Sequence, residues 1–211
     1  MKHLIIIGAR GAGRQTFLTA TRSLGYGYDF DVKGFLDGKS DALDGFDGYP
    51  SILSSVEDYR PQSDDVFVCA LGDPKWRKYY VDIVLQKGGE FMSIVDKTAR
   101  IGQNAKIGRG CVIRDYAVIS CDVTIGDFVY IQPFTVIGHD AVVKDYCHLN
   151  TYAFMGGFSE MSELSVIHTH GTLLPHKKVG VGATIGAGSV AMTNVKEGAT
   201  VVGIPAKRIK V

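Results

Sequence analysis

The sequence predicts a small α/β domain followed by a β-helix built from a six-residue repeat. Three observations lead to this fold class. Large aliphatic residues recur at every sixth position from Ile101 onward. The chain holds 26 glycines in 211 residues, well above the average share of about 7%, and short repeated turns explain this excess. The first third of the chain instead alternates strand-like and helix-like segments, which is typical of a parallel α/β sheet.

The composition is that of an ordinary globular protein. There are 23 Lys and Arg against 22 Asp and Glu, a net charge of +1. This balance gives no electrostatic reason to expect a nucleic acid or an anionic membrane as a partner. No apolar run reaches the roughly 18 residues that span a bilayer, and the start lacks the pattern of a signal peptide. Four cysteines without CxxC spacing indicate a reduced, cytoplasmic protein.

The first third divides into apolar strand-like runs and longer helix-like segments. Strands are expected at 4–7, 31–35 and 66–71, and helices at 15–24 and 76–87. The segment after the last helix leads into the repeat. We therefore predict an α/β domain over 1–95 and a β-helix domain over 96–211.

A glycine-rich turn with Gly8, Gly11 and Gly13 follows the first strand. Such a turn can hold phosphate against backbone N–H groups and a helix N-terminus. Asp37, at the end of the second strand, can contact a ribose or sugar hydroxyl. Since the spacing is not a strict GxGxxG, the alternative is that this turn has only a structural role. The turn also suggests a dehydrogenase, but about 95 residues is short for a full dinucleotide fold, and the repeat would then lack an explanation.

The repeat is read from Ile101 in steps of six residues. Every step finds an aliphatic residue or Met: Ile101, Ile107, Ile113, Ile119, Ile125, Ile131, Ile137, Val143, Leu149, Met155, Met161, Ile167, Leu173, Val179 and Ile185. Four residues after each of them comes a mostly small residue. Three such strand-and-turn units close a triangular coil, with the aliphatic residues inside and the small residues at the corners. Glycines follow the aliphatic residue at 102, 108, 126, 138, 156, 180 and 186, and they are expected to relieve the turns.

This pattern resembles the hexapeptide-repeat acyltransferases. Together with the α/β part, it resembles the sialic acid O-acetyltransferases and nucleotide-aminosugar N-acetyltransferases within that group. The stretches that carry the resemblance are 8–14, 34–37, 70–73, 137–140 and 203–207. The resemblance implies a Rossmann-like N-terminal domain, a left-handed parallel β-helix and a homotrimer with active sites between subunits. It also implies acetyl-CoA as co-substrate and no metal.

The resemblance places the nucleotide part of a nucleotide-sugar substrate in the N-terminal domain. The residues implied to bind it are Arg10, Gly11, Ala12, Asp37, Gly38 and Gly72. The family often has a histidine where this chain has Ala12, so a base or phosphate contact is expected to differ here.

His139 is the expected general base, with Asp140 beside it. Acetyl transfer to an amine or hydroxyl needs a group that accepts a proton near neutral pH, and histidine is suited to this. A neighbouring carboxylate fixes the imidazole tautomer and raises its basicity. From the residues alone an ordinary polar turn is the alternative, and the resemblance favours the base.

The acetyl-CoA site is implied by the resemblance at four positions. His148 would lie near the acetyl group as a polarising or positioning donor, and Gly157, Thr169 and Ala187 would contact coenzyme A along the coil corners. The alternatives are a strand histidine in a subunit interface and a glycine needed only for its turn.

The leading hypothesis is an acetyl-CoA-dependent N-acetyltransferase acting on a nucleotide-linked amino sugar for bacterial surface glycans, with direct attack on the thioester. O-acetylation of sialic acid or a related sugar is the alternative among enzymes, and a trimeric β-helix binding or structural module is the alternative outside them. His168 and His170 lack an evident third metal ligand, and no cysteine or serine arrangement suggests a nucleophile.

Overall fold

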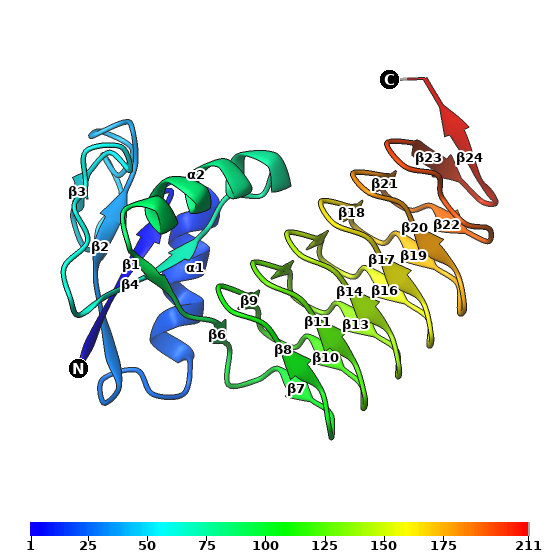
Figure 1. Ribbon diagram of the computed structural model, residues 1–211, viewed down its shortest axis with the longest axis horizontal. Helices are drawn as coiled ribbons and strands as arrows, with labels where there is room; N and C mark the ends of the chain where they lie inside the picture. Colours follow the sequence, from blue (N-terminus) through cyan, green and yellow to red (C-terminus); the bar gives the residue numbers. More distant parts are fainter. Residues whose placement is uncertain (211) are drawn as a thin grey trace.

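The computed structural model describes residues 1–210 as an α/β domain followed by a stack of coils (Figure 1). Five parallel strands form the sheet of the first part, in the order β3–β2–β1–β4–β5. These strands are β1 (Lys2–Ile7), β2 (Phe30–Leu36), β3 (Ile52–Ser54), β4 (Asp65–Cys69) and β5 (Glu90–Phe91). Helix α1 (Gly11–Arg22) connects β1 to β2, and α2 (Pro74–Gln86) lies between β4 and β5.

The two helices begin differently. Asp73 caps α2, because its Oδ1 accepts the N–H groups of Lys75 at 2.8 Å and Trp76 at 3.0 Å. No side chain caps α1, whose first N–H groups follow directly on Arg10. The first turn of α1 therefore presents backbone donors at the carboxyl edge of the sheet.

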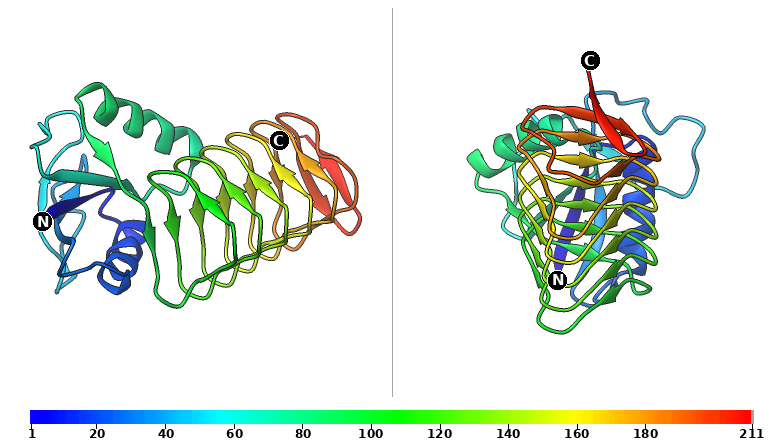
Figure 2. Two further views of the ribbon diagram at one scale, coloured as in Figure 1. Left: turned by 60° about the horizontal axis from the view of Figure 1, so that its bottom comes forward. Right: turned by 90° about the vertical axis from the view of Figure 1, so that its right-hand side faces the viewer.

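The coils form a parallel β-helix with three flat faces, and from the C-terminal end they lie one behind another (Figure 2). Face A contains β7 (Arg100–Ile101), β10 (Val118–Ile119), β13 (Val136–Ile137), β16 (Phe154–Met155), β19 (Thr172–Leu173) and β22 (Val190–Ala191). Face B contains β8 (Lys106–Ile107), β11 (Thr124–Ile125), β14 (Val142–Val143), β17 (Glu160–Met161) and β20 (Lys178–Val179). Face C contains β6 (Ile94–Val95), β9 (Val112–Ile113), β12 (Tyr130–Ile131), β15 (His148–Leu149), β18 (Val166–Ile167), β21 (Thr184–Ile185), β23 (Thr200–Gly203) and the antiparallel β24 (Ala206–Ile209).

The predicted fold class, an α/β domain followed by a β-helix of hexapeptide repeats, is confirmed. The repeat aliphatic residues from Ile113 to Ile185 are at most 2% exposed and fill the interior. Cys111 and Cys147, in the small-residue series, are also wholly buried. Neighbouring coils pair residues that are 18 positions apart, as Val118 with Val136. Within residues 1–210, no helix combines the length and apolar character needed to cross a membrane.

The predicted role of the repeat glycines is wrong. The glycines that follow the aliphatic residues were expected to relieve the turns, yet none of the seven has a positive φ. Twelve non-glycine residues take the left-handed conformation instead, among them Asp140 at φ 58° and Tyr152 at φ 62°. The glycines serve close approach between coils: a Cβ atom at Gly138 would come within 2.6 Å of the backbone nitrogen of Gly157.

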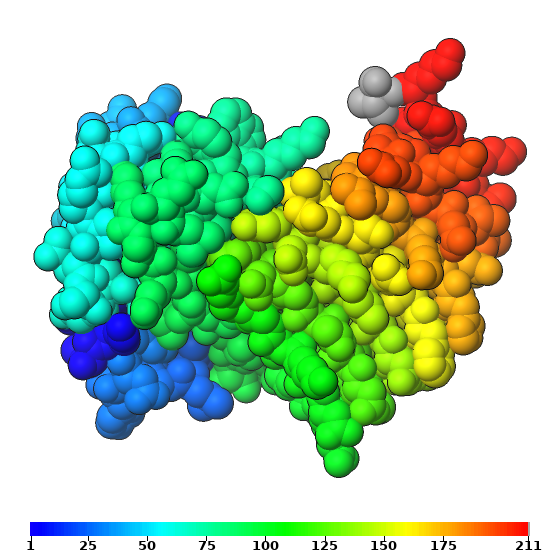
Figure 3. Space-filling model, viewed as in Figure 1, coloured from blue at the N-terminus to red at the C-terminus, as the bar shows by residue number. Residues whose placement is uncertain are grey.

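The α/β domain packs on face C and on the adjacent corner between faces B and C. Apolar residues of both parts share two clusters, so that Tyr130 packs with Leu4 and Ile6, and Tyr146 with Ile7 and Val81. Figure 3 shows the domain in continuous contact with the first coils.

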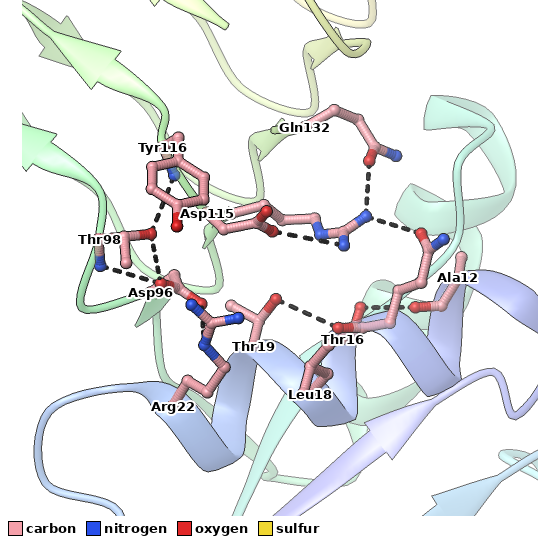
Figure 4. Close-up of polar contacts among 12 residues, drawn as sticks. Ala12, Thr16, Leu18, Thr19, Arg22, Asp96, Thr98, Asp115, Tyr116 and Gln132 are labelled. Atoms are coloured by element: carbon pink, nitrogen blue, oxygen red, sulfur yellow. Dashed lines mark hydrogen bonds and ion pairs between the residues drawn. The ribbon is translucent and has the colours of Figure 1, made fainter. Parts of the chain in front are cut away.

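Polar contacts join α1 to the β-helix (Figure 4). The buried Arg114 donates to Gln15 at 2.7 Å and to Gln132 at 2.9 Å, and Arg22 pairs with Asp96 at 3.3 Å. Helix α1, which begins at the carboxyl edge of the sheet, is thus held at a fixed position along the stack.

Candidate active site

The carboxyl ends of β1, β2 and β4 enclose a pocket of about 250 Å³. Parallel strands place the loops that follow them at one edge, where α/β sheets usually bind ligands. The predicted substrate-binding residues found in its lining are Arg10, Ala12, Asp37, Gly38 and Gly72. Gly11, the sixth predicted residue, is the first residue of α1 and lines a neighbouring pocket.

Asp37 holds the loops around this pocket together. Its Oδ2 accepts the N–H of Ala9 at 2.9 Å, and its Oδ1 accepts the N–H of Lys39 at 3.0 Å. These bonds fix the turn after β1 against the turn after β2. Because each carboxylate oxygen has a further lone pair, Asp37 can also receive a hydroxyl from a ligand.

The glycines at the carboxyl edge of the sheet differ in whether the structure has room for a side chain at their positions. A Cβ atom at Gly11 or Gly38 would meet no atom within 4 Å, and neither residue has a positive φ. A Cβ at Gly13, by contrast, would overlap the carbonyl oxygen of Gly8. Gly13 is therefore needed for the packing of α1, whereas Gly11 and Gly38 leave open backbone beside the pocket.

Gly72 is shared by the linings of the pocket and of a second cavity. It lines both, and the second cavity, of about 400 Å³, lies between the α/β domain and face C. Asp73, His148 and Asn150 form part of its wall. A Cβ atom at Gly72 would contact the ring of His148 at 3.6 Å. The second cavity, with His148 in its wall, therefore begins next to the first pocket at Gly72.

His148 lies on β15, covered by the α/β domain and only 4% exposed. Its ring stacks on Tyr130 with 5.1 Å between centroids, and its Nδ1 lies 3.4 Å from a guanidinium nitrogen of Arg77. Burial, followed by the Arg77 cation, lowers the pKa of His148 to about 3. The imidazole is therefore neutral near pH 7 and unsuited to act as the base.

His139 lies at the corner between faces A and B, opposite face C in the triangular coil. Its side chain is 56% exposed, and its Nδ1 is 2.8 Å from Oδ2 of Asp140. When Nδ1–H is donated to Asp140, Nε2 carries the lone pair that accepts a proton. The edge of Phe158, one coil further, meets the ring with 5.2 Å between centroids.

Gly157 lies one coil from His139 at the same corner. A Cβ atom there would come within 2.7 Å of Nε2 of His139, so the missing side chain makes room for the imidazole. The expected approach of coenzyme A to this backbone stays a prediction.

Thr169 and Ala187, the other positions expected to contact coenzyme A, lie on the corner between faces C and A. Both are exposed, and the carbonyl of Thr169 accepts the N–H of Gly188 at 2.9 Å. In one chain the predicted residues therefore form three groups. One is the His139 corner, one is this corner, and one is the pair of cavities that share Gly72.

The cysteines and histidines of residues 1–210 form neither a metal cluster nor an activated thiol. No group of three or more His, Cys, Asp or Glu side chains that could hold a metal is found there. Burial raises the pKa of Cys69 and Cys147 to about 11 and that of Cys111 to about 12. The pKa of the exposed Cys121 is also raised, first by its hydrogen bond with Asp122. Raised pKa values disfavour the reactive thiolate.

Several residues in or beside these cavities were not predicted from the sequence. Tyr80 and Val56 line the first pocket, and Arg77 contacts His148. Arg77 stands between Trp76 and Lys78 in a polar helical segment, where an arginine is ordinarily solvated. Only the packing of α2 on the β-helix turns it inward.

Residues 3–84 match the family model described as the PglD N-terminal domain. No curated protein is a significant match. The acetyltransferase domain of PglB from Neisseria gonorrhoeae FA1090 is 26% identical with a TM-score of 0.90, covering 99% of this chain and 100% of that chain. That domain has also been solved in complex with acetyl coenzyme A.

Two further solved structures share the whole architecture. PerB from Caulobacter crescentus, in complex with CoA and GDP-perosamine, is 21% identical with a TM-score of 0.89, covering 100% of this chain and 98% of that chain. WeeI from Acinetobacter baumannii AYE is 22% identical with a TM-score of 0.80, covering 99% of this chain and 100% of that chain. A segment similar to the PglD N-terminal domain is thus followed by a hexapeptide-repeat β-helix, and the fold and the enzyme class predicted from the sequence, an acetyltransferase, are confirmed.

Proposed function

We propose that this protein is an acetyl-CoA-dependent N-acetyltransferase that acts on a nucleotide-linked amino sugar in bacterial surface glycan synthesis. The observation that carries the proposal is the exposed His139 with its Nδ1 held 2.8 Å from Asp140. Similar solved structures support it, since one contains acetyl coenzyme A and another contains CoA with GDP-perosamine. Both substrates are cytoplasmic compounds, which agrees with the location expected from the sequence.

The nucleotide part of the substrate would occupy the pocket at the carboxyl edge of the sheet. The open backbone at Gly11 and Gly38 and the uncapped start of α1 suit a diphosphate. Asp37 would accept a hydroxyl of the ribose or sugar. The amino sugar would then extend past Gly72 into the second cavity.

His139 would act as the general base. The neutral amine attacks the thioester carbonyl carbon, a C–N bond forms and the carbonyl electrons move to oxygen. Nε2 of His139 takes the proton from the nitrogen, while Asp140 holds Nδ1–H and stabilises the imidazolium. When the oxyanion collapses, the C–S bond breaks and the leaving thiolate receives that proton from His139. The products are the amide and free CoA, and His139 is neutral again.

The active site would be completed by a second copy of the chain, in a homotrimer. His139 stands at the corner opposite face C, whereas face C carries the α/β domain with its nucleotide pocket. A chain therefore does not bring its own His139 to its own pocket. Face A and its corner with face C expose apolar side chains, including Phe134, Tyr152 and Phe154 at 41%, 47% and 40%, which suits a subunit interface.

The first experiment measures free thiol released from acetyl-CoA. The acceptors are UDP-, dTDP- and GDP-linked 4-amino sugars, GDP-perosamine among them, and free sialic acid. Release with one nucleotide-linked amine, abolished in His139→Ala, would establish N-acetylation. Release with sialic acid alone would assign the protein to O-acetylation. If acetyl-CoA neither binds nor reacts with any acceptor, the chain is a binding or structural module.

Subunit mixing tests the shared active site. His139→Ala removes the proposed base, and Gly38→Trp fills the nucleotide pocket at a position with open space around it. Each variant alone should be inactive. Mixed trimers formed after dissociation and reassembly should regain activity, because one subunit supplies the base and the other supplies the pocket. Mixtures that stay inactive would place both functions within one chain.

A further inference from the structure

Arg77 is a buried cation with an unusual set of partners. It is 1% exposed. One terminal nitrogen donates to the carbonyl of Leu71 at 2.7 Å, and the other donates to the carbonyls of Tyr146 at 2.6 Å and Cys147 at 3.0 Å. Burial lowers the pKa of the guanidinium, but arginine remains protonated in proteins. A buried charge held mainly by carbonyl dipoles is costly, so its position calls for a reason.

The fourth contact of Arg77 is with His148. The terminal nitrogen that donates to Leu71 also lies 3.4 Å from Nδ1 of His148. A guanidinium has only donors, so Nδ1 must be the acceptor in this pair. A neutral imidazole with Nδ1 as acceptor carries its proton on Nε2. The contact thus selects one of the two neutral tautomers.

The selected N–H has no hydrogen-bond partner among residues 1–210. Nε2 of His148 is buried and makes no hydrogen bond, which is rare for a buried polar atom. His148 forms part of the wall of the second cavity, between Gly72 and Asn150. A buried donor without a partner, in a side chain that belongs to a cavity wall, points to an acceptor atom supplied by a ligand.

The charged and titratable groups around His148 keep its ring neutral. Arg77 on α2 repels a second positive charge, and Tyr130 on β12 covers one face of the ring without contributing charge near pH 7. Asp73 lies in the same cavity wall, but its Oδ1 is engaged by two backbone N–H groups of α2. His168 is the remaining titratable neighbour, and its effect also opposes protonation of His148.

We propose that Arg77 is a positioning residue that fixes His148 as its Nε2–H tautomer, which makes this N–H a permanent hydrogen-bond donor to an oxygen of the bound substrate. The inference rests on the proposed function, and it identifies that oxygen as the thioester carbonyl oxygen of acetyl-CoA. A donor aimed at this atom before the reaction stabilises the negative charge that develops on it. The two histidines then divide the chemistry: His139 moves protons, and His148 never does.

The tautomer can be read without substrate. In the full chain labelled with ¹⁵N-histidine, long-range ¹H–¹⁵N spectra report which ring nitrogen is protonated, and His148→Gln assigns the signals. We expect His148 to show Nε2–H throughout the range from about pH 5.5 to about pH 8.5. In Arg77→Lys, a single ammonium cannot reach every former partner, so both tautomers should be populated. Arg114→Lys is the matched control, because it shortens another buried arginine of the domain junction and should leave the His148 signals unchanged.

Kinetics separate positioning from general stability. His148→Gln should lower kcat by about 10²–10³, the usual effect of losing one oxyanion donor, and Arg77→Lys should lower it about tenfold with the KM for the acceptor unchanged. In the His148→Gln background Arg77→Lys should cost nothing further, because Arg77 acts through His148.

The proposal and the proposed function can fail separately. An Nδ1–H tautomer or a titrating His148 in the wild-type protein would overturn the role of Arg77, even if Arg77→Lys does not fold and whatever the acceptor. An equal loss from Arg77→Lys with and without His148 would overturn it too. Absence of acetyl transfer with the expected tautomer intact would instead contradict the proposed function.

Discussion

The corner that carries His139 and the junction that carries His148 give the same side chain opposite properties. The two residues are nine positions apart in one repeat. His139 is 56% exposed at a corner beside a carboxylate, whereas His148 is 4% exposed on a strand beneath a second domain and beside a cation. The repeat therefore decides only where each ring projects. What covers that position decides whether the ring exchanges protons.

The largest expected effect comes from removing the base at the exposed corner. His139→Ala should lower kcat by about 10²–10⁴, with little change in thermal stability, because the side chain is largely solvated. Rates of thiol release with saturating acetyl-CoA and acceptor measure this effect. His3→Ala is the control, since His3 pairs with Asp31 and Asp64 in the α/β domain. Near-normal turnover of His139→Ala would remove the contrast between the two histidines.

The buried histidine should reveal itself through acid stability. The pKa of His148 is about 3 in the folded protein, against about 6.5 for histidine in an unfolded chain. Below about pH 6.5 the unfolded state therefore binds more protons, and the free energy of unfolding falls as the pH decreases. Between about pH 7 and about pH 5 we expect a loss of about 2 kcal/mol through this residue.

Urea unfolding of the wild-type protein and of His148→Gln at several pH values isolates this contribution. The difference in free energy between the two proteins should shrink as the pH falls, because glutamine does not titrate. A difference that is constant with pH would show that His148 is solvated, contrary to the structure.

Gly157→Ala tests how closely the exposed corner is packed. The new Cβ atom would come within 2.7 Å of Nε2 of His139, so the ring must turn away. We expect kcat to fall about tenfold, as for a catalytic group displaced from its position. Stability should change little because the ring can move into solvent. In the His139→Ala background the substitution should have no effect on residual activity, and a persisting loss would point to a direct contact of Gly157 with substrate.

The smallest effect is expected at the nucleotide pocket. Gly11→Ala should leave stability unchanged or raise it by about 0.5 kcal/mol, since alanine favours a helix and meets no neighbour. The KM for the nucleotide sugar should rise several-fold if phosphate approaches this backbone. Gly13→Ala is the contrasting variant, because its Cβ overlaps Gly8 and it should unfold at a lower temperature. Equal KM values for wild type and Gly11→Ala would remove Gly11 from the binding site.

The fold could be predicted because one kind of residue occupies the same position in every repeat. Aliphatic residues at steps of six from Ile101 mark the inner position of the coil strands, and the glycine turn after residues 4–7 marks the carboxyl end of β1. The reason for the corner glycines was predicted wrongly. A sequence shows that a side chain is absent, but the backbone that excludes it belongs to the next coil, 19 residues further on in the case of Gly138 and Gly157.

The site could be predicted only in part. His139 with Asp140 is a local pair, and the pocket residues follow strand ends, so both leave a pattern in the sequence. The junction leaves none: Arg77, Tyr130 and His148 come from α2 and two different coils, and they meet only because the α/β domain docks on face C. Burial of these side chains depends on how the two domains pack. The residue types at these positions do not indicate that packing.

Because residues 18 apart pair along each face, the number of residues in the repeat determines the length of the stack. Stacked strands are separated by about 4.8 Å, so each further 18 residues advance the stack by that step and return to the same face. Duplication of one whole coil beyond the junction would lengthen the molecule while leaving both histidines in place. An insertion of any other length would rotate all later residues onto different faces, turning interior aliphatic side chains toward solvent. Homologues of this chain that differ in coil number should therefore differ by multiples of 18 residues, with odd lengths confined to loops that leave the stack.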